Sequence, residues 1–200
     1  MLDSSLGRSG SASAAALDRV AQALARARIT PNSLSYAALT LGLVAAALFY
    51  TQRAGLAYAV LLASGLCDAV DGRVARLGGT VTRWGGVLDL TFDRIVEASV
   101  LLGIALPHPA WHQAALLVAC AWYVNLCVFL AVGAASERGE KLIAYPPGLL
   151  ERTEALLFAA VVVVAPTWVP AAGYLYATLS LITGAQRFRF GRRALAPPDT

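Results

Sequence analysis

The chain has 200 residues, of which 58% are hydrophobic and 14% are charged, and its mean hydropathy is +0.63. Soluble domains carry about a quarter charged residues, so this composition excludes an ordinary soluble domain and indicates an integral membrane protein. The 3 cysteines lie in apolar runs and match neither a disulfide framework nor a zinc-binding spacing.

The N-terminal region precedes the apolar stretches. Residues 1–13 are rich in Ser, Gly and Ala and lack the apolar core of a signal peptide, so we expect them to be disordered. Residues 14–29 alternate leucines and a valine with arginines at helical spacing. A short basic amphipathic segment directly before a span is typical of a helix in the membrane interface. A soluble tail helix is the alternative.

Six apolar stretches follow, at residues 33–51, 54–76, 85–106, 110–135, 151–164 and 171–188. A spanning helix needs about 20 mainly apolar residues. Thr30 can cap the first helix, and Pro31 suits its first position because proline lacks the N–H that would be unpaired there. We therefore predict an all-α bundle of six transmembrane helices preceded by the interfacial helix. Residues 14–190 form one membrane domain, followed by a basic, disordered tail at 191–200.

The basic residues predict the orientation of this bundle. One side receives the N-terminal arginines, the loops at 73–83 and 136–152, and the C-terminal tail. Of the 16 Lys and Arg residues, the other side receives only Arg53. By the positive-inside rule the crowded side is cytoplasmic. We therefore expect a multi-pass protein of the cell membrane.

Four aspartates lie at the predicted cytoplasmic ends of the second and third spans. Asp68 and Asp71 are three residues apart, and Asp89 and Asp93 are four apart, so each pair shares a helix face. Glu97 continues the second face, either supporting a cation ligand or hydrogen bonding to another helix. Such carboxylates cannot all stay ionised in a low dielectric without a cation. Oxygen ligands favour Mg²⁺ or Mn²⁺, and four carboxylates are enough for two ions.

Glycines and arginines surround the aspartates. Gly72 and Gly85 remove side chains where a bulky group must approach, and Arg76, Arg83 and Arg73 offer donors for phosphate oxygens. Together with the cations they predict a pyrophosphate substrate. Each feature also has a simpler explanation: the aspartates as an ion pathway, the glycines as packing devices, and the arginines as positive-inside residues.

The complete spacing, D-x2-D-G-x2-A-R-x8-G-x3-D-x3-D, resembles the signature of the CDP-alcohol phosphotransferase (CDP-alcohol phosphatidyltransferase) family. All eight positions are met, by Asp68, Asp71, Gly72, Ala75, Arg76, Gly85, Asp89 and Asp93. The resemblance implies an integral membrane enzyme, usually a homodimer. It would transfer a phosphatidyl or phosphoalcohol group from a CDP-linked donor, such as CDP-diacylglycerol, to an acceptor hydroxyl and release CMP. We expect no nucleic-acid partner.

The resemblance also implies roles for individual residues. Asp68, Asp71 and Asp89 would hold one cation, and Asp68, Asp89 and Asp93 the other. Asp93 would also be the general base that acts on the acceptor hydroxyl. The implied contacts to the CDP donor are Pro31, Asn32, Ser33, Gly72, Ala75, Arg76, Thr82 and Gly85.

The segments at 82–85 and 93–94 are similar to those of phosphatidylinositol-phosphate synthases, so the implied acceptor is inositol phosphate or a similar polyol. Arg152 and Arg187 are the candidate acceptor-binding residues. Ala155 and the apolar segment 129–133 lack cations expected in that branch, which leaves an unphosphorylated acceptor open.

Other functions remain as alternatives. Within the same family, a phosphatidylglycerophosphate-type transferase would use a different acceptor. From a different class, a divalent-cation transporter fits less well, because transporter sites usually lie near the bilayer midplane. An inactive scaffold is disfavoured by the complete motif.

Overall fold

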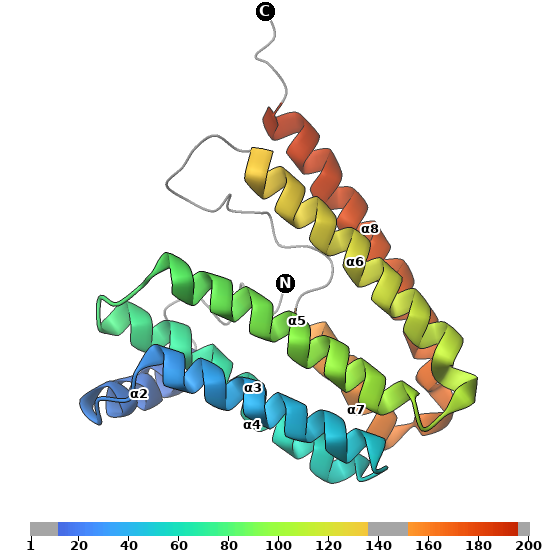
Figure 1. Cartoon of the computed structure of the whole chain (residues 1–200), viewed down its shortest axis with the longest axis horizontal. Helices are drawn as coiled ribbons and strands as arrows, with labels where there is room; N and C mark the ends of the chain where they lie inside the picture. Colours follow the sequence, from blue (N-terminus) through green and yellow to red (C-terminus); the bar gives the residue numbers. More distant parts are fainter. Residues whose placement is uncertain (1–11, 136–151, 196–200) are drawn as a thin grey trace, which may run out of the picture. The chain divides into compact units, whose positions relative to one another are not determined.

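The computed structural model describes residues 12–135 and 152–195, and in these two ranges all regular structure is helical. The segments predicted to be disordered, 1–13 and 191–200, lie partly outside these ranges, and the predicted loop at 136–147 lies wholly outside them. The elements are α2 (Ala12–Arg26), α3 (Pro31–Tyr50), α4 (Ala54–Leu77), α5 (Arg83–Ala105), η1 (Pro109–Trp111), α6 (His112–Ala135), α7 (Arg152–Val164), η2 (Pro166–Trp168) and α8 (Val169–Leu195), as shown in Figure 1.

The predicted helix boundaries agree with the observed ones to within a few residues for the first four spans. Thr30 caps α3 as expected, because its Oγ1 accepts a hydrogen bond from the N–H of Ser33. The last helix differs most. Pro170 was expected in the turn before it, but it lies in the first turn of α8, where the missing N–H of proline is tolerated. α8 also continues past 188, to Leu195.

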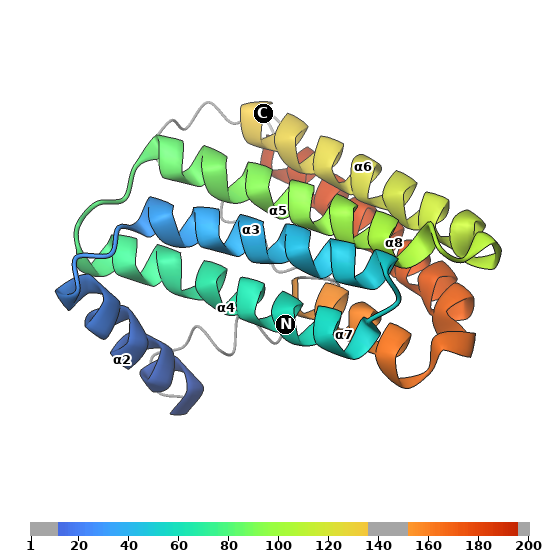
Figure 2. The same ribbon diagram turned by 60° about the horizontal axis from the view of Figure 1, so that its bottom comes forward.

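The chain forms two compact units. The first contains α2 to α5, and in it α3, α4 and α5 run side by side, with α3 contacting both of the others (Figure 2). Small residues permit this close packing. Gly42 of α3 receives the side chain of Val96, and Gly103 of α5 lies against the backbone of Ala46. The Oγ of Ser64 on α4 donates a 2.7 Å hydrogen bond to the carbonyl oxygen of Ala38.

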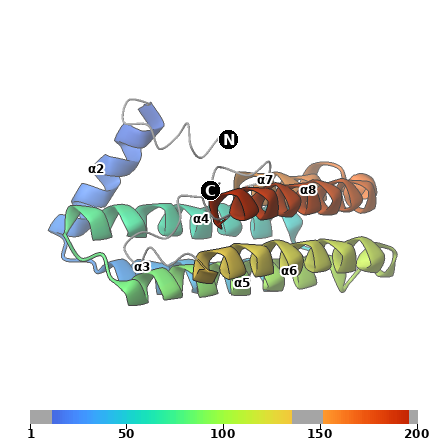
Figure 3. The ribbon, with the colours of Figure 1, turned by 90° about the horizontal axis from the view of Figure 1, so that it is seen from above.

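In Figure 3, α2 leaves the ends of α3 and α4 at a steep angle. Its apolar side contacts α4 in a buried cluster made by Ala21, Val70 and Val74 and covered by Leu17, Leu24, Ala25 and Leu34. Beside this cluster, Nη1 of Arg73 donates to Oδ1 of Asp18 at 2.5 Å. A helix therefore lies where one was predicted, and part of its apolar side is covered by α4.

The second unit contains η1, α6, residues 152–161 of α7, η2 and α8. α6 and α8 pack together along a line of glycines on α8. The glycines and their neighbours on α6 are Gly173 with Ala114, Gly184 with Asn125, and Gly191 with Val132. The sequence offset between each glycine of α8 and its neighbour on α6 is constant, so both helices advance in the same direction and run parallel.

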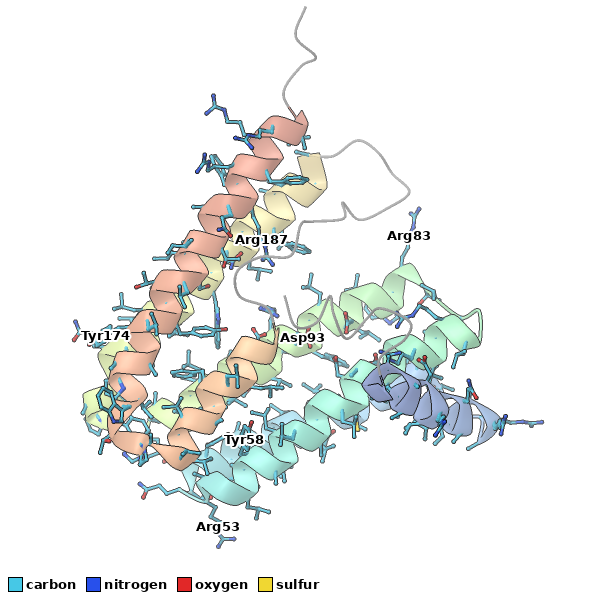
Figure 4. The ribbon with its side chains drawn as sticks, turned by 180° about the vertical axis from the view of Figure 1, so that it is seen from behind. Arg53, Tyr58, Arg83, Asp93, Tyr174 and Arg187 are labelled. Carbon is cyan, nitrogen blue, oxygen red and sulfur yellow. The ribbon has the colours of Figure 1, made fainter. Side chains whose placement is uncertain are left out.

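Hydrogen bonds between side chains also join α6 and α8. Tyr174 Oη donates to Gln113 Oε1 at 3.1 Å, Trp122 Nε1 donates to Tyr176 Oη at 3.3 Å, and Arg187 Nη1 donates to Asn125 Oδ1 at 2.8 Å. Because a polar group without a partner is costly in a bilayer, these bonds fix which residues of the two helices face each other. Tyr174 and Arg187 are labelled in Figure 4.

Three helical segments of the described chain are long and apolar enough to cross a membrane: Pro31–Tyr50, Ala54–Leu77 and Pro109–Ala135. The prediction of an all-helical integral membrane protein is confirmed at this level. α5 and α8 have 23 and 27 residues, which is also long enough, but both carry several charged residues.

Candidate active site

Three of the four predicted aspartates meet at the junction of α4 and α5. Asp68, Asp71 and Asp89 each place one carboxylate oxygen within 4.8 Å of the others. Asp68 and Asp71 share a face of α4 because they are three residues apart. The short turn after α4, in which Gly79 has φ +63°, reverses the chain and brings Asp89 of α5 beside them.

These three carboxylates differ in their exposure to solvent. Asp71 is 7% exposed, Asp68 is half-buried and Asp89 is exposed, so the site is closed at one side and open at the other. The buried carboxylate is held by Ser35 of α3, whose Oγ donates to Asp71 Oδ2 at 2.5 Å. An ionised buried carboxylate requires such donors. The sequence prediction did not include Ser35, because nothing in its local spacing points to Asp71.

Asp93 lies one turn beyond Asp89 on α5. It is not one of the three described aspartates whose carboxylate oxygens lie within 4.8 Å of one another. Figure 4 labels Asp93 on this helix, with Arg83 at the start of the same helix. The Asp93 side chain is 21% exposed, and its Oδ2 lies 4.0 Å from Nη2 of Arg94. The predicted cation ligands thus divide into a close group of three and a fourth carboxylate one turn away.

Glu97 continues the acidic face of α5 and is paired within its own helix. Its two oxygens bind Arg94, with Nη1 2.6 Å from Oε2 and Nη2 donating to Oε1 at 2.8 Å. This two-point contact occupies both carboxylate oxygens. The sequence analysis offered two roles for Glu97: support of a cation ligand, or a hydrogen bond to another helix. In the described residues Glu97 bonds neither to Asp68, Asp71 or Asp89 nor to another helix. Its partner is Arg94.

Several predicted donor-binding residues surround the turn between α4 and α5. A Cβ on Gly72 would lie 3.4 Å from Nη1 of Arg76, so the exposed Arg76 side chain extends over this glycine. Thr82 caps α5, since its Oγ1 accepts from the N–H of Gly85 at 3.0 Å. Ala75 is half-buried on α4. These residues lie in the last two turns of α4 and at the start of α5, the two helices that carry the aspartate group.

The first turn of α3 holds the other predicted donor contacts. Asn32 and Ser33 are exposed, and Pro31 is half-buried. The Oγ of Ser33 donates to the carbonyl oxygen of Thr30 at 2.7 Å, so its own proton is already used. Ser33 can therefore offer a ligand only its acceptor capacity, whereas the amide of Asn32 can both donate and accept.

Two predicted arginines have protein partners. Arg73, one of the candidate phosphate donors, is paired with Asp18 of α2, which the sequence analysis did not single out. Arg187 donates to Asn125, and its guanidinium carbon lies 5.9 Å from the centre of the Phe129 ring. Arg152 begins α7, and its side chain lies outside the described residues.

The aspartate group fits a hard divalent cation. With Mg–O distances of about 2.1 Å, neighbouring ligand oxygens of Mg²⁺ are about 3.0 Å apart and opposite ones about 4.2 Å apart. The three aspartate oxygens lie within 4.8 Å of one another, close enough for one cation to be bound among them. Three carboxylates this close also repel one another unless a positive charge lies among them. The donor set contains only oxygen, as Mg²⁺ and Mn²⁺ prefer.

Comparison with known proteins agrees with this site. The sequence profile of CDP-alcohol phosphatidyltransferases matches residues 28–185. The chain belongs to this family. All eight motif residues lie inside the matched range, so the resemblance inferred from their spacing is confirmed. The chain is therefore an enzyme of the CDP-alcohol phosphatidyltransferase class.

Relatives and solved structures within the family are similar over most of the chain. Archaetidylinositol phosphate synthase of Pyrococcus horikoshii is 37% identical over 137 residues, which cover 64% of this chain and 72% of that protein. Phosphatidylinositol phosphate synthase of Streptomyces avermitilis is 29% identical over 192 residues, covering 88% of this chain and 78% of the relative. The crystal structure of Mycobacterium tuberculosis phosphatidylinositol phosphate synthase with CDP-DAG bound has a TM-score of 0.73 at 26% identity, covering 88% of this chain and 93% of that one. A structure of the same synthase in complex with manganese and citrate has a TM-score of 0.73 at 27% identity and covers 88% of each chain.

Proposed function

We propose that this enzyme transfers a phosphatidyl group from CDP-diacylglycerol to a hydroxyl of inositol phosphate, or of a similar polyol, and releases CMP. The observation that carries the proposal is the group of three carboxylates, Asp68, Asp71 and Asp89, within the complete family motif. The family match supports the reaction class, and the names of the similar synthases support an inositol phosphate acceptor.

Asp68, Asp71 and Asp89 would hold one Mg²⁺ or Mn²⁺ ion, and Asp68, Asp89 and Asp93 a second. When bound, the cations supply positive charge that neutralises the pyrophosphate of the donor. The manganese in the similar synthase structure supports this assignment.

The remaining steps belong to the side chains of the chain itself. Arg76 and Thr82 bind the CDP part of the donor, beside Gly72, Ala75 and Gly85, which leave room for it. Pro31, Asn32 and Ser33 close over the same group. An Asp93 oxygen accepts the proton of the acceptor hydroxyl, whose oxygen forms the new bond to phosphorus as the bond to CMP breaks.

Arg152 and Arg187 are our candidates for binding the acceptor phosphate, because arginine forms two-point hydrogen bonds with phosphate oxygens. The contacts of Arg187 with Asn125 and with the Phe129 ring hold its guanidinium in place. A polyol phosphate would then be bound through its phosphate.

We further propose that residues 14–190 form a single membrane domain of six spans, with α2 in the interface. The active site would face the cytoplasm, and two copies would form a homodimer. Consecutive membrane spans alternate in direction, so the parallel arrangement of α6 and α8 supports an odd number of membrane spans between these two helices. The concentration of Lys and Arg on one side supports the orientation.

A CMP-release assay tests the function. Purified protein is supplied with Mn²⁺ or Mg²⁺, CDP-diacylglycerol and one acceptor at a time: inositol phosphate, inositol or glycerol phosphate. We expect CMP with inositol phosphate. Release only with glycerol phosphate would overturn the acceptor assignment, and no release with any acceptor, together with metal flux in liposomes, would overturn the enzyme assignment.

The Asp93→Asn variant tests the proposed base. Loss of a general base typically lowers the rate by about 10²- to 10⁴-fold, and we expect a loss in this range with donor binding retained. Asp18→Asn, the same change at an aspartate outside the site, is the control and should retain turnover. Near-normal turnover of Asp93→Asn would show that another group accepts the proton.

A further inference from the structure

Ser35 of α3 makes a contact that the proposed chemistry does not yet use. Its Oγ lies 2.5 Å from Asp71 Oδ2 and 3.3 Å from the carbonyl oxygen of Pro31. A serine hydroxyl has one proton, and the much shorter contact identifies the carboxylate as its main acceptor. Both side chains are buried, at 9% and 7% exposure, so water does not substitute freely for this bond.

A second serine at the same interface shows what an ordinary packing contact is like. Ser64 of α4 is also buried, at 4% exposure, and its Oγ donates to the carbonyl oxygen of Ala38. Both serines join α3 to α4 with one hydroxyl. They differ in the acceptor, which is a neutral backbone carbonyl for Ser64 and the carboxylate of a candidate cation ligand for Ser35.

The bond to Ser35 limits what the Asp71 carboxylate can do. An O–H donated to one oxygen fixes the rotation of the carboxylate about its last torsion and directs the remaining lone pairs. Asp71 is the most buried member of the aspartate group, so its orientation decides whether it can share a cation with Asp68 and Asp89. Ser35 also contacts the carbonyl of Pro31, in the turn that we propose closes over CDP.

We propose that Ser35 is a positioning residue for the cation site: it holds the Asp71 carboxylate in the orientation that binds a divalent cation, and it links that carboxylate to the start of α3. The proposal rests on the proposed function, in which Asp71 is a cation ligand. Groups that orient a metal ligand through a hydrogen bond typically change metal affinity by about 10- to 100-fold when they are removed.

The test measures Mn²⁺ binding to the full-length protein in detergent, from the electron paramagnetic resonance signal of free Mn²⁺. We expect Ser35→Ala to weaken Mn²⁺ binding by about 10- to 100-fold. Ser35→Thr, which keeps the hydroxyl, should restore most of the affinity, and Ser35→Cys, which has the same branching with a larger sulfur that donates only weakly, should not. Ser64→Ala removes a hydroxyl from the same interface and should leave Mn²⁺ affinity unchanged, which separates orientation of the ligand from packing of α3 on α4.

CMP release provides a second measurement. For Ser35→Ala we expect a higher Mn²⁺ concentration at half-maximal rate, with most of the wild-type rate recovered at saturating Mn²⁺. A purely structural role would instead lower the rate at all Mn²⁺ concentrations, for Ser35→Ala and Ser64→Ala alike, and that result would overturn the proposal.

The two measurements distinguish failure of this inference from failure of the proposed function. Wild-type Mn²⁺ affinity in both Ser35→Ala and Ser35→Cys overturns the role of Ser35 even if CMP is released normally. If the wild-type protein binds Mn²⁺ but releases no CMP with any acceptor, the proposed function fails and the Mn²⁺ affinities alone decide on Ser35. If the wild-type protein binds no Mn²⁺, the positioning role is overturned as well.

Discussion

The acidic face of α5 ends with Glu97, and a Glu97→Gln variant tests whether this residue belongs to the cation site or only to the fold. Both Glu97 oxygens contact Arg94, at 2.6 and 2.8 Å. Nε of Arg94 is buried without a hydrogen-bond partner in the described residues, so this guanidinium depends on its two outer nitrogens. We expect Glu97→Gln to destabilise the protein and to leave Mn²⁺ affinity unchanged.

The size of the effect follows from the burial of the pair. Exposed ion pairs contribute about 0–1 kcal/mol, whereas removal of one partner of a fully buried pair typically costs about 3–5 kcal/mol. The side chains of Arg94 and Glu97 are 38% and 20% exposed, between these limits. We therefore expect Glu97→Gln to lower the free energy of unfolding by about 2 kcal/mol.

Unfolding in detergent by heat or denaturant measures the stability, and the Mn²⁺ signal measures cation binding on the same samples. The double variant Arg94→Gln/Glu97→Gln removes both charges, so it should lose less stability than the two single changes added together. Asp89→Asn is the matched variant on the same face of α5, and it should lose Mn²⁺ affinity. If Glu97→Gln weakened Mn²⁺ binding as much as Asp89→Asn and left unfolding unchanged, Glu97 would be a cation ligand and our reasoning would be wrong.

Two further predictions concern packing in the same unit. In Gly103→Ala the added Cβ would lie 2.3 Å from the carbonyl oxygen of Ala46, so α3 and α5 must separate. We expect the free energy of unfolding, measured by heat or denaturant, to fall by about 1–3 kcal/mol. Gly133→Ala, whose Cβ meets nothing within 4 Å, is the control, and an equal loss of stability there would contradict the argument. Asp18→Asn removes the ion pair to Arg73, and the Asp18 side chain is 50% exposed. We therefore expect the free energy of unfolding to fall by about 0.5–1 kcal/mol, and by less at high salt. A loss of stability that does not depend on salt would argue against an electrostatic contact.

Features that depend on spacing along one helix could be predicted from the sequence. Thr30 and Pro31 start a helix for local reasons, and the predicted boundary agrees with α3. Three- and four-residue spacings placed the aspartates on common faces because every α-helix has the same 3.6-residue turn. The short turn between the two helices then limited where Asp89 could lie relative to Asp68.

Contacts between helices far apart in sequence could not be predicted. Ser35 and Asp71 are 36 residues apart, and Asp18 and Arg73 are 55 apart. Whether they meet depends on how one helix is shifted along the other, which close packing of many side chains decides. The same reason explains why Asp18 was not predicted as the partner of Arg73: only the docking of α2 on α4 brings the two side chains together.

The regular offset between α6 and α8 has a mechanical consequence. Each of the three glycines on α8 follows its neighbour on α6 by 59 residues, so the two helices neither slip nor diverge from Gly173 to Gly191. That interval rises about 27 Å at 1.5 Å per residue, close to the roughly 30 Å thickness of a bilayer core. Sliding one helix past the other would break the hydrogen bonds of Gln113, Trp122 and Asn125 together. The two helices therefore move as one rigid pair, and any movement of Arg187 along the helix axis carries α6 with it.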